Sequence, residues 1–149
     1  MKATWLYRTA AVLLVLFALG HTFGFLHFKP PTQEGVAVHN AMNNVTFQVR
    51  GATLSYGGFY VGFGLFVTAY LLFGAFLAWY LAGLAGKAPR VASTLGWGLF
   101  AVQIASAALS WIYFAGAPTA FSSVLAACLG WAAWLVQGNK GLSGYPSIG

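Results

Sequence analysis

Residues 50–66 read RGATLSYGGFYVGFGLF and mark the point where a polar segment passes into a long apolar run. The stretch holds an arginine, two tyrosines spaced four apart (Tyr56 and Tyr60) and five glycines, four of which (Gly57, Gly58, Gly62 and Gly64) lie where the apolar run begins. Glycines leave a smooth helix surface on which another helix can pack closely. We therefore expect the remaining segments to wrap around the outer end of a helix that begins here.

The composition around this stretch is that of a membrane protein. Of the 149 residues, 60% are hydrophobic, 17% are aromatic and only 5% are charged. A soluble domain carries about 25% charged residues to cover its surface, so most of this surface must face lipid. The net charge of +6 reflects seven Lys and Arg against a single acid, Glu34. Because the basic residues are spread over termini and loops, we expect no nucleic acid as a partner, but contacts with membrane lipids.

Four apolar runs predict an all-α fold, a four-transmembrane-helix bundle in a single membrane domain over residues 1–149. Spans are expected at residues 5–28, 56–85, 91–116 and 119–136, since about 20 apolar residues suffice to cross a bilayer. The first run opens like a secretory signal, but its length favours a span. The glycine-rich tail, residues 137–149, is expected to be flexible.

A long polar segment, residues 29–55, separates the first two spans and forms the predicted outer loop. Pro30 and Pro31 end the first helix. Further along, four apolar residues recur at helical spacing: Val38, Met42, Val45 and Val49. This spacing predicts a short amphipathic helix at the membrane surface, where it would cap the bundle.

The basic residues predict the orientation of the chain. One side of the membrane receives the larger group, which comprises Lys2, Arg8, Lys87, Arg90 and Lys140. The other side receives Lys29 and Arg50, offset by Glu34. We therefore expect a multi-pass protein of the inner (cytoplasmic) membrane with both termini cytoplasmic.

Polar and small residues recur on the first two spans. His21 lies between glycines, and Gly20 and Gly24 are four apart. Gly58 and Gly62 repeat this small-xxx-small pattern on the second span. Such pairs let a neighbouring helix approach closely, so we expect these four glycines at helix-packing positions.

The third span carries four polar residues on one helical face: Gln103, Ser106, Ser110 and Tyr113. The fourth span begins with Thr119, Ser122 and Ser123. At about 1.5 Å of rise per residue, polar groups of all four spans fall at one level in the outer half of the membrane: His21, Tyr56, Tyr60, Ser110, Tyr113 and residues 119–123. We therefore predict a polar pocket in the outer half of the bundle, covered by the loop that carries Glu34, His39 and Arg50. The predicted ligand-binding residues are Arg50, Tyr56, Gln103, Ser106, Ser110 and Tyr113.

Each of these residues also has a purely structural interpretation. His21 either donates a hydrogen bond to a facing helix or takes part in ligand binding and proton transfer. Tyr56 and Tyr113 suit an aromatic belt at the membrane interface. The serines of the third span are typical of hydrogen bonds between packed helices. Arg50 can pair with Glu34 or with lipid headgroups, or hold an anionic ligand.

Several chemistries are disfavoured by what the sequence lacks. No acidic residue lies inside a predicted span, which argues against a carboxylate proton relay. Cys128 is the single cysteine, so no disulfide can form within the chain. The three histidines lie on one helix end and one loop, so we expect no metal and no cofactor.

Three segments carry a resemblance to a known family: ALGHTFGF (residues 18–25), MNNVTFQVRG (42–51) and SYGGFYVGFGLF (55–66). They resemble a family of small hypothetical four-span bacterial membrane proteins. The resemblance implies a bundle and a role for His21, Arg50, Tyr56 and Tyr60, but supplies no activity. In architecture the chain is also similar to DoxX-like proteins and to sterol-isomerase-like bundles, which handle apolar molecules. The acidic residues that sterol isomerases place in their spans are missing here.

Two functional hypotheses follow. In the first, the protein binds a lipid-like or other apolar small molecule in the outer pocket. Any catalysis in that pocket would be an isomerase-type proton transfer, with His21 as acid and base and Tyr60 as hydrogen-bond donor. In the second, it is a non-catalytic accessory or structural subunit of a homo-oligomer or a larger membrane complex. The sequence leaves open whether the protein is an enzyme.

Overall fold

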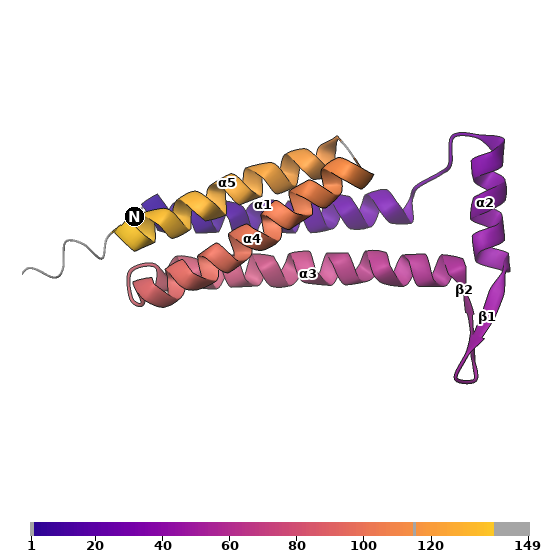
Figure 1. The fold of residues 1–149 in the computed structure, drawn as a ribbon, viewed down its shortest axis with the longest axis horizontal. Helices are drawn as coiled ribbons and strands as arrows, with labels where there is room; N and C mark the ends of the chain where they lie inside the picture. Colours follow the sequence, from indigo (N-terminus) through magenta and orange to yellow (C-terminus); the bar gives the residue numbers. More distant parts are fainter. Residues whose placement is uncertain (1, 115, 139–149) are drawn as a thin grey trace, which may run out of the picture. The chain divides into compact units, whose positions relative to one another are not determined.

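The computed structural model describes residues 2–114 and 116–138, so Lys140 and most of the predicted flexible tail lie outside the described residues. It contains four long helices, labelled in Figure 1: α1 (Lys2–Leu26), α3 (Tyr56–Leu84), α4 (Pro89–Tyr113) and α5 (Ala117–Gly138). All four are long and apolar enough to cross a membrane. The predicted all-α class and four spans are confirmed, and the chain is a multi-pass membrane protein.

The ends of these helices follow from local sequence. Pro89 occupies the first turn of α4, where its missing N–H costs nothing. Gly116 has a φ of 60° directly before α5, a conformation that favours glycine. The predicted spans therefore differ from the observed helices only by a few residues at their ends.

Packing divides the chain into two parts, which we describe separately. The bundle part comprises residues 2–17 and 71–138, and the loop part comprises residues 18–70. Helices α1 and α3 contribute residues to both parts.

The bundle part has a core made largely of alanine and leucine from all four long helices. The buried residues at its centre include Ala10, Leu14, Ala78, Leu81, Ala92, Leu125, Leu129 and Ala132. Tyr7 is the largest fully buried side chain, and its hydroxyl donates a hydrogen bond to the Ala92 carbonyl (3.0 Å). Small side chains allow the helices to approach closely, as membrane helices do.

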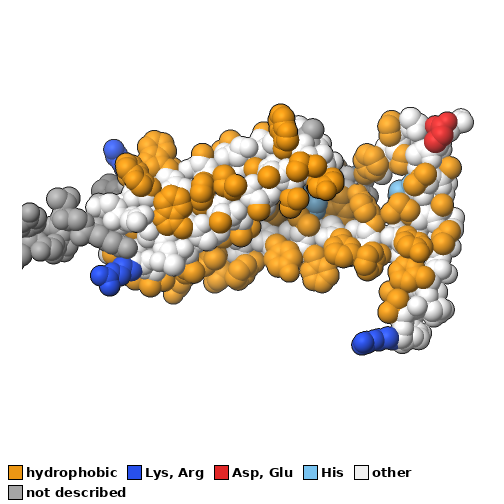
Figure 2. All heavy atoms as spheres, in the orientation of Figure 1, with side chains coloured by type: hydrophobic (Ala, Val, Ile, Leu, Met, Phe, Trp, Pro, Cys, Tyr) orange, Lys and Arg blue, Asp and Glu red, His pale blue; other side chains and the backbone are white. Residues whose placement is uncertain are grey.

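The outside of the bundle part is apolar. Figure 2 shows hydrophobic side chains over its visible face, with Lys and Arg only at one end. Trp111 is 75% exposed and Phe114 is 74% exposed. In water such a continuous apolar surface would drive association, whereas in a bilayer it is the surface that lipid contacts.

The loop part contains the predicted surface helix and a β-hairpin that was not predicted. Helix α2 (Gln33–Asn44) begins at Thr32, whose side chain accepts a hydrogen bond from the Gly35 N–H (3.1 Å). Strands β1 (Thr46–Val49) and β2 (Ala52–Ser55) follow and pair antiparallel. The helix itself is confirmed, but its predicted extension through Val45 and Val49 is wrong.

The hairpin has a local cause. Arg50 and Gly51 connect the strands with φ values of 48° and 84°, and two positive φ angles are what a type I′ turn requires. The preceding Thr46 to Val49 segment is rich in β-branched and aromatic residues, which favour a strand. Val45 already has extended backbone as the residue that ends α2.

Candidate functional site

In the loop part, α1 and α3 are joined by a polar seam that consists of His21, Thr22, Gly64 and Thr68. The Nε2 atom of His21 lies 3.1 Å from the carbonyl oxygen of Gly64. The hydroxyl oxygens of Thr22 and Thr68 are 2.7 Å apart. Both contacts connect residues more than 40 positions apart in the sequence, so they hold the two helices in a fixed register.

The contact with Gly64 indicates which nitrogen of the His21 ring carries a proton. A carbonyl oxygen only accepts hydrogen bonds, so we place the proton on Nε2. Within the described residues, no hydrogen bond is formed by Nδ1 of this half-buried ring. The Gly64 carbonyl also accepts from the Thr68 hydroxyl (3.2 Å). Nε2 therefore takes part in the contact between α1 and α3.

At Gly64 the ring of Phe25 occupies the space that a side chain would fill. A Cβ atom there would lie 2.6 Å from Cε2 of Phe25, closer than real contacts allow. The same Phe25 ring lies 5.1 Å from the His21 ring and 6.5 Å from the ring of Tyr60, measured between centroids. Phe25 thus lies between the two residues that were predicted to be catalytic, and sequence reasoning did not single it out.

The other predicted residues of the loop part are more exposed. Tyr60 and Tyr56 are each 51% exposed, and Tyr56 packs on Phe47 of the hairpin at a centroid distance of 4.8 Å. Arg50 lies in the hairpin turn. Within the described residues of the loop part, no ion pair joins it to Glu34. The contact with Phe47 means that the hairpin positions the Tyr56 ring.

The glycines divide into two groups. At Gly20, Gly24 and Gly62 an added Cβ would meet no described atom within 4 Å, and at Gly58 it would meet only the Ser55 hydroxyl. These predicted packing positions are open. The glycines that neighbours do crowd are different ones: Gly35, Gly57 and Gly64 in the loop part, and Gly96 and Gly130 in the bundle part.

In the bundle part, the predicted polar face of α4 is largely buried. Gln103 is 4% exposed, Ser110 is 8% exposed and Ser106 is half-buried, whereas Tyr113 is 73% exposed. On α5, Ser122 is completely buried. The buried members of the predicted ligand-binding set in this part are therefore Gln103 and Ser110.

Three buried atoms of these helices have no hydrogen-bond partner within the described residues: Oε1 of Gln103, Oγ1 of Thr119 and Oγ of Ser122. We call these three residues the α4–α5 polar cluster. Most buried polar atoms in proteins are paired, so three unpaired ones on two adjacent helices require an explanation.

The register of the two helices sets these three residues at neighbouring levels along the bundle part. Ser93 donates to the carbonyl of Ala133 (3.3 Å), and a Cβ on Gly130 would touch the ring of Phe100. Continuing this antiparallel register sets Ser122 opposite roughly residues 104–108, so it lies within about 8 Å of Gln103 along the axis. Thr119 falls one turn beyond, at the level of Ser110.

Among the described residues, no group of three His, Cys, Asp or Glu side chains could hold a metal ion. His27 is engaged within its own helix, since its Nδ1 atom lies 2.9 Å from the carbonyl oxygen of Phe23 and can donate a hydrogen bond to it. The polar side chains described above can form hydrogen bonds, and an imidazole ring such as that of His21 is also capable of proton exchange.

No protein-family profile, no curated protein and no solved structure matches this chain. The resemblance to small four-span bacterial proteins stays a prediction.

Proposed function

We propose that this protein binds a lipid-like molecule and holds its polar end at the α4–α5 polar cluster. The observation that carries the proposal is the set of three buried polar atoms, on Gln103, Thr119 and Ser122, that lack partners within the described chain. An unsatisfied buried polar atom costs about 1–3 kcal/mol, and in hydrocarbon no water is at hand to satisfy it. A bound polar group would remove that cost.

The donor pattern narrows the chemistry of the ligand. The free atom of Gln103 is its amide oxygen, which can only accept. The two hydroxyls can donate as well as accept. The polar end of the ligand must therefore carry an O–H or N–H donor, as an alcohol or an amide does, and the apolar helix surfaces suit a long hydrocarbon body.

An enzymatic form of the proposal places isomerase-type proton transfer at His21, with Tyr60 as a hydrogen-bond donor. The bond from Nε2 to the Gly64 carbonyl supports Nδ1 as the atom that would exchange the proton. Tyr60 has a half-exposed ring that reaches His21 only through Phe25. Binding is therefore the part of the proposal with the stronger geometric support.

We further propose that the protein lies in the cytoplasmic membrane with both termini in the cytoplasm. The start of α1 and the α3–α4 turn lie at the same end of the bundle part, since Lys2 and Gly86 line one pocket. This end carries Lys2, Arg8, Lys87 and Arg90. Such a concentration of basic residues is typical of the cytoplasmic side.

The test is native mass spectrometry of protein extracted gently from its own membrane. Wild type should carry a stoichiometric small-molecule adduct, and Gln103→Leu and Ser122→Ala should lose it. Ser123→Ala is the matched control, because Ser123 is the exposed neighbour of the buried Ser122. If wild type carries no adduct and Gln103→Leu unfolds at higher detergent concentration, the buried amide is merely a packing defect and the proposal is wrong.

A second candidate function, a subunit of a homo-oligomer or a larger complex, is favoured by a different observation. Gly20, Gly24 and Gly62 offer helix surface that no described residue covers. Replacing Gly58 and Gly62 by Leu should then dissociate the assembly in mild detergent. An unaltered oligomer in that variant would exclude this face as the contact.

A further inference from the structure

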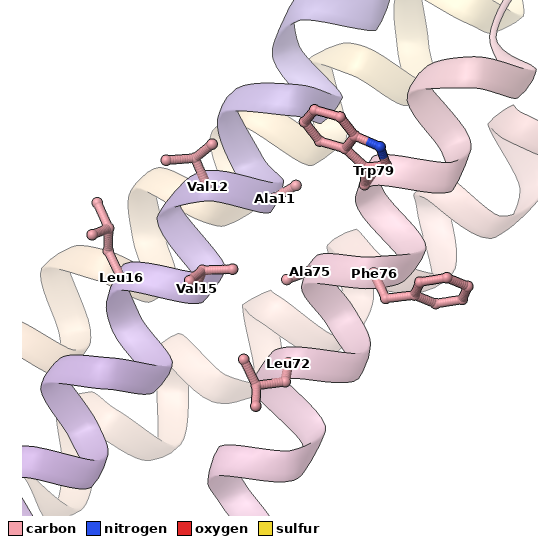
Figure 3. A pocket seen from close by; sticks show the side chains of 8 residues that line it. All are labelled: Ala11, Val12, Val15, Leu16, Leu72, Ala75, Phe76 and Trp79. Carbon is pink, nitrogen blue, oxygen red and sulfur yellow. The ribbon is translucent and has the colours of Figure 1, made fainter.

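The bundle part has an open apolar groove of about 400 Å³ between α1 and α3. Eight residues line it: Ala11, Val12, Val15, Leu16, Leu72, Ala75, Phe76 and Trp79. Figure 3 shows the cause of the groove, because Ala11 and Ala75 point toward one another from facing helices and are too short to fill the space. Val15 also points into the gap, whereas Val12 and Phe76 lie along its edges.

A cation lies at one end of this groove. The guanidinium carbon of Arg8 is 5.4 Å from the centroid of the Trp79 ring, and that ring is part of the lining. Arg8 precedes Ala11 and Val12 by three and four residues, so it lies one turn before them on the same helical face. Its N–H groups form no hydrogen bond within the described residues. As far as residues 2–114 and 116–138 are concerned, these groups are available to an acceptor at the mouth of the groove.

The charge around this end is of one sign. In residues 2–114 and 116–138, the bundle part carries Lys2, Arg8, Lys87 and Arg90. The single acid of the chain, Glu34, belongs to the loop part. An anionic group at the mouth of the groove therefore meets attraction from Arg8 and no carboxylate of the bundle part.

We propose that this groove holds one acyl chain of an anionic phospholipid, whose phosphate lies against Arg8. The apolar lining positions the chain but does not select it, because any lipid tail is equally apolar. Selection comes from the net charge of the headgroup. A guanidinium can bind the phosphate oxygens of any phospholipid through two parallel N–H groups, but in phosphatidylcholine the choline cation offsets the phosphate charge, whereas an anionic headgroup keeps it. The site lies on a different surface from the α4–α5 polar cluster, so its failure leaves the proposed function untouched.

The experiment measures lipid adducts on the full chain by native mass spectrometry, after exchange into detergent with equal amounts of dioleoyl-phosphatidylglycerol and dioleoyl-phosphatidylcholine. We expect about a fivefold preference for the anionic lipid, the ratio that about 1 kcal/mol per Arg near a membrane surface gives. Arg8→Gln should abolish this preference. Arg90→Gln, which removes the same charge at the same end away from the groove, should retain it.

A second variant tests the groove itself. Val15→Phe should fill it and lower the phosphatidylglycerol adduct about fivefold, whereas Val102→Phe, on the exposed face of α4, should leave the adduct unchanged. If Arg8→Gln and Arg90→Gln lost the preference for phosphatidylglycerol equally, the preference would come from the general surface charge of this end, and the proposal would be overturned. An undiminished phosphatidylglycerol adduct in Val15→Phe would also overturn the proposal. A wild-type dimer that Val15→Phe dissociates would mean that a second copy covers the groove, which also overturns it.

Discussion

Gly96→Ala should destabilise the bundle part, mainly through a clash with Tyr7. The added Cβ would overlap the hydroxyl of Tyr7 and lie 3.1 Å from the Cβ of Ala133. Tyr7 is fully buried and its hydroxyl is bonded to the carbonyl of Ala92, so the ring has no free space to enter. The substitution must therefore break this hydrogen bond or push α4 away from its neighbours.

The size of the effect follows from three terms. Overpacking a core costs about 1–3 kcal/mol. Loss of the Tyr7 hydrogen bond adds about 1 kcal/mol. The higher helix propensity of alanine than of glycine stabilises the variant by about 1 kcal/mol. We expect a net loss of about 1–3 kcal/mol in the free energy of unfolding, measured by titrating the folded protein in mild detergent with a denaturing one.

Two further variants show whether the clash is the cause. Tyr7→Phe removes the hydroxyl that Gly96→Ala would strike, so the double variant should be more stable than the two single losses predict, by about 1–2 kcal/mol. Gly98→Ala is the control, because an added Cβ there meets nothing within 4 Å; it should be neutral or slightly stabilising. Additivity of the two changes to within about 0.5 kcal/mol would refute the reasoning.

Two other predictions concern the loop part. Gly51→Ala should destabilise the hairpin by about 1 kcal/mol, because Gly51 has a φ of 84°, whereas Arg50→Asn should be tolerated at a φ of 48°. Hydrogen exchange of the strand amides measures both effects. If the amides of Gly51→Ala were protected as well as those of the wild type, the turn assignment would be contradicted. Thr22→Val should cost about 0.6–2 kcal/mol of unfolding free energy by removing the bond to Thr68, and Thr9→Val, on the exposed face of α1, should cost less. An equal loss in the two threonine variants would mean that the seam adds no stability.

Hydropathy was sufficient to predict the four spans, because in lipid an apolar run of this length has only the helix available to satisfy its backbone. The hairpin escaped prediction for a local reason. Val45 and Val49 continue the helical spacing of Val38 and Met42, yet they fit a strand equally well. The Arg50–Gly51 turn also departs from the Asn-Gly and Asp-Gly pairs that usually mark such hairpins.

The candidate sites were predictable only in part. The polar spacing on α4 led to Gln103 and Ser110, which are buried. For His21, a bond to a facing helix was one of the two predicted roles, and the bond to Gly64 is present. Phe25 and Tyr7 were not identified, because their roles depend on which helix faces pack together. No periodicity within a single helix contains that information.

The alanine-rich core has a consequence for how this sequence can vary. Ala10, Ala78, Ala92 and Ala132 are all fully buried, so size rather than hydrophobicity is constrained at these positions. Glycine or serine should be accepted there more readily than leucine, although leucine is the more apolar residue. On the outer surface the constraint is reversed, since positions such as Trp111 and Ile112 need only remain apolar. Divergent versions of this chain should therefore keep a pattern of small residues inside and exchange large ones freely outside.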